Sequence, residues 1–311
     1  MNLIHLNNSS NLSKRFKISL TFIAIFIGVT IAGFWDYHVV DGFGSEIVAG
    51  NMVGDTSKLA GAFLEKGLSF GILFGFAAGL AATFTACNCV IFAMLPGLAC
   101  STDKSSTRKN ALIALGVFSL GVLFVTSLYG LYTGFMSSSE INLYNERGVR
   151  LTQAYVIFTA LGLLMLSWGL ISFGFFNGIV SKLPLKIRTF FSMPVTKAGV
   201  MGIMVGLFSV GRPFPVFRDF LTYAASADNP LYGALVMSVQ GIGQILIMVV
   251  LFVVVIALFG KRLAKWSQNK PHQTVILSAF SLLIGGAYFI FYWGFAVPYG
   301  IGRWGEWFGW Y

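Results

Sequence analysis

Two cysteines separated by a single residue, Cys87 and Cys89, are the side chains of this sequence best suited to chemistry. A Cys-x-Cys pair can form a strained, easily reduced disulfide, or it can hold a soft ion such as Cu(I). The two positions are about 200° apart around a regular helix, so the thiols face together only where the helix unwinds. The alternative is that both are inert cysteines buried among Ala, Thr and Phe side chains.

Charged residues within apolar sequence are the second candidate feature. Arg212, Arg218 and Asp219 fall inside a long apolar stretch, where an unpaired charge is costly. Arg212 could lower the pKa of Cys87 or Cys89, hold an anion, or cap free carbonyl groups at helix ends. Arg218 and Asp219 could instead extend to the membrane surface.

Neither a metal nor another cofactor is predicted. His5, His38 and His272 all flank the apolar stretches, so no histidine completes a metal site within them. The glycine ladders serve close helix packing, because none follows a strand in a βαβ unit. Gln240 and Gln244, one helical turn apart, are expected to link neighbouring helices.

The composition is that of a polytopic membrane protein, which excludes soluble enzyme classes. Of the 311 residues, 56% are hydrophobic and only 10% are charged, and the mean hydropathy is +0.79. Soluble domains are about a quarter charged. The net charge of +10 does not indicate nucleic acid, because the basic residues lie in short loops between apolar stretches. There they orient the chain in a lipid bilayer.

A helix needs about 20 apolar residues to cross a bilayer. The sequence therefore predicts an all-α protein with seven transmembrane helices, at residues 18–35, 68–100, 110–135, 154–180, 198–226, 231–260 and 273–297. The first is interpreted as an uncleaved signal anchor, because no small-residue cleavage site follows its apolar core.

The basic residues are distributed unequally between the segments that join these spans. Fourteen of the 21 lie in one alternating set and five in the other. The richer set is the N-terminal segment, 101–109, 181–197 and 261–272, and the poorer set is 36–67, 136–153, 227–230 and 298–311. This bias predicts a cytoplasmic N-terminus and an extracytoplasmic C-terminus.

Two of the spans are too long for straight crossings, since the 33 residues of span 68–100 would extend about 50 Å. Each contains a small-residue ladder that leads into a polar, proline-bearing interruption. The interruptions are Thr85–Cys89 with Pro96 and Gly97 in the first case, and Gly211–Pro215 with Pro213 and Pro215 in the second. Irregular backbone at membrane depth is tolerated only against protein or a wet cavity, so both breaks are expected at the centre of the molecule.

Each broken span is followed by two ordinary ones, which predicts two inverted three-helix repeats, 68–180 and 198–297, after an extra N-terminal helix. The alternative is two unrelated kinked helices. Residues 1–67 then hold the signal anchor and an extracytoplasmic segment, whose residues 58–66 form either an amphipathic helix or a solvated loop. The aromatic tail 298–311 either anchors the last span at the interface or docks a partner.

The first break is similar to a motif of a known family. Thr85-Ala86-Cys87 followed by Pro96-Gly97 resembles the Thr/Ser-Pro-Cys and Pro-Gly of the CcdA/DsbD transmembrane family. That family passes reducing equivalents from cytoplasmic thioredoxin to extracytoplasmic thiols, including those needed for cytochrome c maturation. The resemblance covers residues 68–297 and implies the fold with two inverted repeats.

The second break matches the family in part. Pro215 resembles the last proline of the family's second Thr-Pro-Cys-x-x-Pro motif, and Gly233-Ala234-Leu235 follows it as in the family. Arg212 stands where the second cysteine is expected, and no cysteine occurs after Cys100. The intramembrane disulfide of the family's electron path therefore cannot form in this chain.

These observations leave three possible functions. We favour an accessory or assembly subunit of a membrane redox complex related to cytochrome c biogenesis, with other membrane or extracytoplasmic subunits as partners. The alternatives are a thiol-disulfide electron carrier that uses Cys87 and Cys89 with thioredoxin-like proteins, and a transporter of a small anion or soft metal. The resemblance implies a multi-pass protein of the bacterial plasma membrane.

Overall fold

Seven long helices dominate the structure. The computed structural model describes residues 13–85, 107–182, 184–185 and 193–310, and every regular element within these ranges is helical. Seven of the described helices are long and apolar enough to cross a membrane, which is the number that the sequence predicts, and the described elements agree with the predicted all-α class. They are α2 (Lys14–Gly33), α6 (Phe63–Ala82), α8 (Thr107–Thr133), α10 (Arg147–Phe173), α13 (Pro194–Gly211), α15 (Pro230–Asn269) and α16 (Pro271–Phe291).

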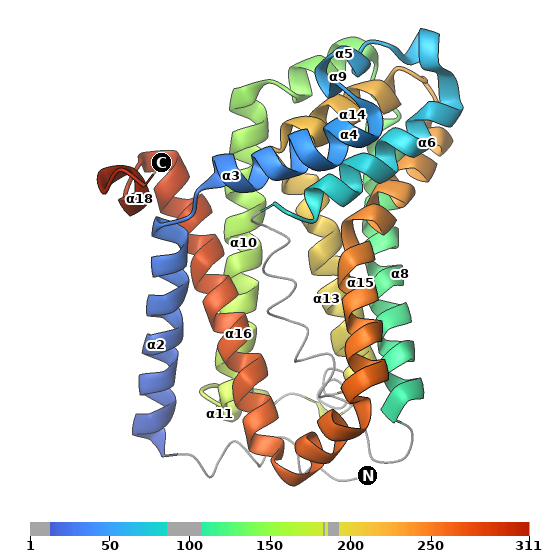
Figure 1. Ribbon diagram of the computed structural model, residues 1–311. Helices are drawn as coiled ribbons and strands as arrows, with labels where there is room; N and C mark the ends of the chain where they lie inside the picture. The colour runs from blue at the N-terminus through green and yellow to red at the C-terminus, as the bar shows by residue number, and fades with distance from the viewer. Residues whose placement is uncertain (1–12, 86–106, 183, 186–192, 311) are drawn as a thin grey trace.

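The helices form one bundle (Figure 1). Helix α8 packs against both α13 and α15, α15 also packs against α6, and α10 packs against α16. Helix α2 lies outside on α16. Glycines allow the closest approaches: a side chain at Gly202 of α13 would overlap the carbonyl of Phe118 of α8, and Gly130 of α8 meets Gly233 of α15.

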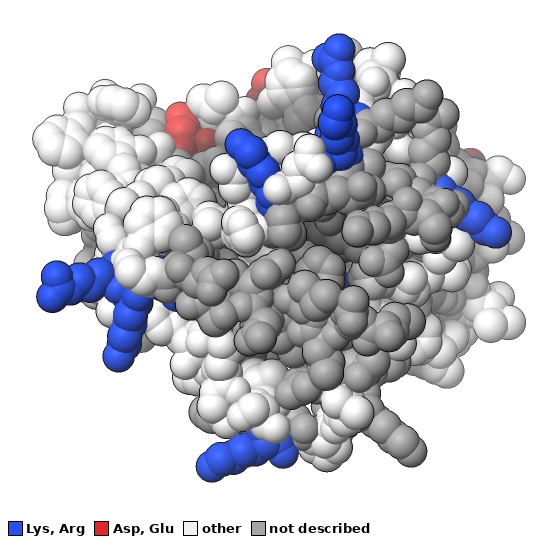
Figure 2. All heavy atoms as spheres, turned by 90° about the horizontal axis from the view of Figure 1, so that it is seen from below, with Lys and Arg blue, Asp and Glu red and all other residues white. Residues whose placement is uncertain are grey.

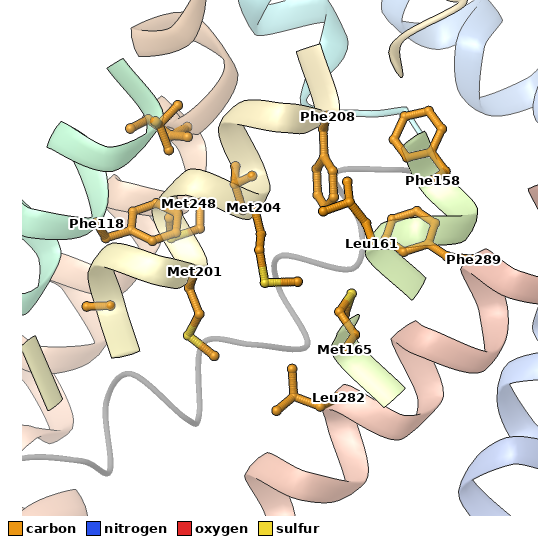
Figure 3. Close-up of a cluster of buried hydrophobic side chains, with 14 of the residues drawn as sticks. Phe118, Phe158, Leu161, Met165, Met201, Met204, Phe208, Met248, Leu282 and Phe289 are labelled. Atoms are coloured by element: carbon orange, nitrogen blue, oxygen red, sulfur yellow. The ribbon is translucent and has the colours of Figure 1, made fainter. Parts of the chain in front are cut away.

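Apolar side chains fill the space between these helices. Figure 3 shows Met201, Met204 and Phe208 extending from α13 toward Met165 of α10 and Leu282 of α16. All five are buried in one hydrophobic cluster that also includes residues of α8 and α15. This cluster fixes the positions of the helices that carry the polar groups described below.

The predicted break in span 198–226 is present. Helix α13 ends at Gly211 and a separate helix, α14 (Pro215–Ala225), begins four residues later. A residue before proline is driven out of the helical region, and Arg212 before Pro213 is extended, with φ −72° and ψ 117°. Pro215 occupies the first turn of α14, where its missing N–H costs nothing.

The segment between α2 and α6 is more regular than the sequence suggested. It contains α3 (Tyr37–Gly42), the π-helical η2 (Phe43–Ala49), α4 (Gly50–Val53) and α5 (Thr56–Leu59). Residues 58–66 form neither of the two predicted alternatives, a single helix or a loop, because α5 ends at Leu59 and α6 begins at Phe63. Asp36 and Asp55 accept backbone hydrogen bonds at the starts of α3 and α5, so local capping selects these shorter helices.

The two ends of the bundle differ. At one end, called here the α14 end, α14 lies with α3, α4, α5 and α9 (Ser138–Tyr144). Viewed toward the opposite end, where α15 meets α16, the molecule shows Lys and Arg side chains around its rim and little acidic surface (Figure 2). The chain ends at the α14 end with α18 (Trp304–Trp307), whose Trp304 ring packs against Phe34.

Candidate functional site

Arg212 lies in the break between α13 and α14, and its side chain is fully buried. Its Nη1 donates a hydrogen bond to Oε1 of Gln244 on α15, at 3.3 Å. The guanidinium carbon also lies 5.7 Å from the centre of the Phe217 ring, over its face. The cation is therefore held from two sides, by α15 and by α14.

Gln244 is the centre of a buried polar network, called here the central polar network: Thr83, Ser209, Arg212, Gln240 and Gln244. Oε1 of Gln244 accepts from the Ser209 hydroxyl at 2.7 Å and from Nε2 of Gln240 at 3.2 Å, as well as from Arg212. Nε2 of Gln244 donates to the Val205 carbonyl at 3.3 Å. Helices α13 and α15 are thus joined at the break, and the two glutamines link helices as predicted.

The network extends to the end of α6, shortly before the predicted first break. The Thr83 hydroxyl lies 3.1 Å from the carbonyl oxygen of Gln244, to which it donates. Thr85 is also buried, but its hydroxyl donates to the carbonyl oxygen of Ala82, the last residue of α6, at 2.7 Å. Arg212 and the end of α6 are therefore connected through Gln244.

Several predicted site residues cannot be placed. Cys87, Cys89, Pro96 and Gly97 lie outside the described residues, and so does Cys100. The proximity of Arg212 to the two cysteines accordingly stays a prediction. In the described part of the chain, no group of three or more His, Cys, Asp or Glu side chains could hold a metal ion.

Asp41 of α3 is an acidic neighbour of this site that sequence reasoning missed. Burial raises the pKa of the Asp41 carboxyl to about 6, against the opposing charges of Arg212 and His38. The segment between α2 and α6 therefore brings a carboxyl within electrostatic range of the buried guanidinium. The sequence around Val40, Asp41 and Gly42 gives no sign that this carboxyl is buried rather than exposed to solvent.

Arg218 and Asp219 occupy different environments. Arg218 is only 2% exposed, so the prediction that it extends to the membrane surface is wrong. Its Nη1 and Nη2 donate to the side-chain oxygens of Asn145 and Gln153 at 3.4 and 3.3 Å, rather than to Asp219. Asp219 accepts from the Thr56 hydroxyl at 2.8 Å, and burial raises the pKa of its carboxyl.

The site is a place where polar groups fix helices to one another. Its described members are an arginine, two glutamines and two hydroxyls, which donate and accept hydrogen bonds but transfer no electrons. Comparisons of the chain with protein-family models, with curated proteins and with solved structures find no match. The resemblance to the CcdA/DsbD family therefore stays a prediction based on the sequence motifs.

We expect Arg212→Lys to lower the free energy of unfolding nearly as much as Arg212→Ala, by about 3 kcal/mol. A lysine ammonium cannot reproduce the planar guanidinium that both donates to Gln244 and stacks on Phe217. Thermal unfolding in detergent measures the loss. The exposed Arg262 provides the control, because Arg262→Lys should leave stability unchanged. Full stability of Arg212→Lys would contradict the role assigned to the guanidinium.

Asp41 should make stability depend on pH. Its pKa is raised on folding from 3.8 to about 6, so the folded protein binds the proton more tightly than the unfolded chain. The stabilisation of the folded state by protonated Asp41 is complete below pH 3.8 and is lost as the pH rises to about 6. The difference in unfolding temperature between the protein and Asp41→Asn should change across this window. An unchanged difference would show that the carboxyl titrates normally.

Proposed function

We propose that this protein is a divergent CcdA/DsbD-like membrane protein that serves as an accessory or assembly subunit of a membrane redox complex related to cytochrome c biogenesis. The observation that carries the proposal is the environment of Arg212. In the family pattern a redox cysteine stands at this position. Here the position holds a fully buried arginine that is hydrogen-bonded to α15.

A guanidinium cannot exchange electrons with a thiol. Its hydrogen bond to Gln244, and the bonds of Gln244 to Ser209 and Gln240, instead hold the break in one conformation. Electron carriage across the membrane needs two thiols that meet and separate. A rigid second break therefore favours a subunit with a fixed shape over a carrier with two alternating states.

The packing of the helices supports the proposed inverted repeats. If α6, α8 and α10 correspond to α13, α15 and α16, a two-fold axis exchanges the pair α6–α15 with the pair α13–α8. Both of these pairs pack closely. The same axis maps the pairs α8–α15 and α10–α16 onto themselves, and these pairs are also closely packed. Helix α2 then lies outside the repeats as an additional helix.

The proposed orientation places the α14 end outside the bacterial plasma membrane. The rim of Lys and Arg side chains at the opposite end supports a cytoplasmic location for that end (Figure 2). The C-terminus would then be extracytoplasmic. Trp307, Phe308 and Trp310 are exposed there and are available to the bilayer interface or to an extracytoplasmic partner subunit.

A complementation experiment separates the accessory function from the carrier function. Deletion of the gene should reduce covalent haem attachment to c-type cytochromes in the membrane fraction. The double variant Cys87→Ser, Cys89→Ser should restore attachment to at least half, because an accessory subunit does not need the thiols. A deletion without effect would contradict the proposed function. Failure of a normally inserted double variant would instead assign the protein a redox role.

A further inference from the structure

Arg218 is a buried cation with neutral partners. Its two terminal nitrogens donate to Asn145 and Gln153, and its guanidinium carbon lies 5.6 Å from the centre of the Tyr144 ring. Its Nε is buried and has no hydrogen-bond partner in the described part of the chain. Among the described residues no carboxylate forms an ion pair with it. A buried charge in this state needs an anion to offset it.

A second arginine shares this environment. Arg150 lies three residues before Gln153, so both side chains lie on the same face of α10. Nε of Arg150 is likewise buried without a partner among the described residues. The charges of Arg218 and Arg147 both act on Arg150 unfavourably, and Asp219 is the acidic residue that opposes them. We call Arg147, Arg150 and Arg218 the arginine cluster.

The start of α10 adds to the positive potential. Helix N-termini present free N–H groups and a positive dipole end, which disfavour cations and attract anions. Helix α10 has no acidic residue in its first turn, and its N-cap residue Glu146 makes no side-chain capping bond. The three arginines therefore outnumber the two nearby carboxyls, Glu146 and Asp219, around a helix end that would itself bind an anion.

We propose that the arginine cluster and the N-terminus of α10 form a binding site for a phosphate-type oxyanion at the α14 end. Guanidinium groups bind such oxyanions through paired N–H donors, and among the described residues neither Arg150 nor Arg218 has a carboxylate partner. Arg150 is half-buried, so the oxyanion reaches it from the surface while Arg218 lies below. This site is separate from the central polar network and does not depend on the proposed function.

The oxyanion has two possible sources, which share this chemistry. Free phosphate would enter from water, since Arg147 and Gly148 are exposed. A phospholipid headgroup would enter from the bilayer, and the exposed Leu143, Val149 and Val156 beside the site provide an apolar surface for its acyl chains. Both sources place a phosphate against the same arginines.

Thermal unfolding with defined probes tests the site and distinguishes its sources. In detergent without lipid, inorganic phosphate should raise the unfolding temperature by about 3 °C relative to chloride at equal ionic strength. If the source is a lipid, the increase should instead appear in nanodiscs of phosphatidylglycerol relative to nanodiscs of a phosphate-free galactolipid. Either increase should disappear in Arg150→Gln, the variant at the accessible edge of the site, which should still fold.

Arg262→Gln, an exposed substitution at the other end of the bundle, is the matched control and should keep the increase. Arg218→Gln should also abolish the increase if it folds. The absence of an increase with both probes would overturn the proposal. An increase that persists in Arg150→Gln would overturn it as well, because it would show that the anion acts elsewhere.

Discussion

The placement of a cation at the end of a broken helix is the constraint on which the rest of the structure depends. Arg212 is fully buried, and a guanidinium without polar contacts at that depth would unfold the segment that carries it. The chain meets this requirement internally. Gln244 presents its side-chain oxygen to Arg212, Phe217 presents the face of its ring, and Asp41 adds a carboxyl within electrostatic range. Three different elements, α15, α14 and α3, are thus held to one point.

The same constraint explains why Gln244 receives so many hydrogen bonds. Ser209 of α13 and Gln240 of α15 both donate to the side-chain oxygen of Gln244. Thr83, at the end of α6, donates to the backbone carbonyl oxygen of Gln244. Close approach at the glycines of α8, α13 and α15 brings these helices near enough for such short side chains to meet. The hydrogen bonds at the centre of the bundle therefore depend on the small residues that let the surrounding helices approach closely.

Much of this fold follows from simple sequence rules. Hydropathy alone predicts the seven spans, and the two prolines of Gly211–Pro215 predict the end of α13 and the start of α14. The spacing of Gln240 and Gln244 predicts a polar link between helices. These features depend on local sequence, so they can be predicted without knowing which helices pack against each other.

The remaining features depend on tertiary contacts and have no local signature. Thr83, Ser209 and Asp41 are ordinary residues in sequence, and only the packing of distant helices makes them partners of the buried network. Arg218 was expected at the surface because it stands near a span end, yet it is buried against Tyr144, Asn145 and Gln153, from the end of α9 and from α10. Helices α3 and α5 were missed because their starts depend on single aspartate caps rather than on periodicity.

A double-mutant cycle would show whether Arg212 holds the break through Gln244. Arg212→Met, Gln244→Leu and the double variant would be compared with the unaltered protein by reversible unfolding in detergent. If Arg212 acts through Gln244, the two substitutions should be coupled by at least about 1 kcal/mol. Additive effects, with a coupling energy near zero, would contradict that role by showing that the two side chains stabilise the fold independently.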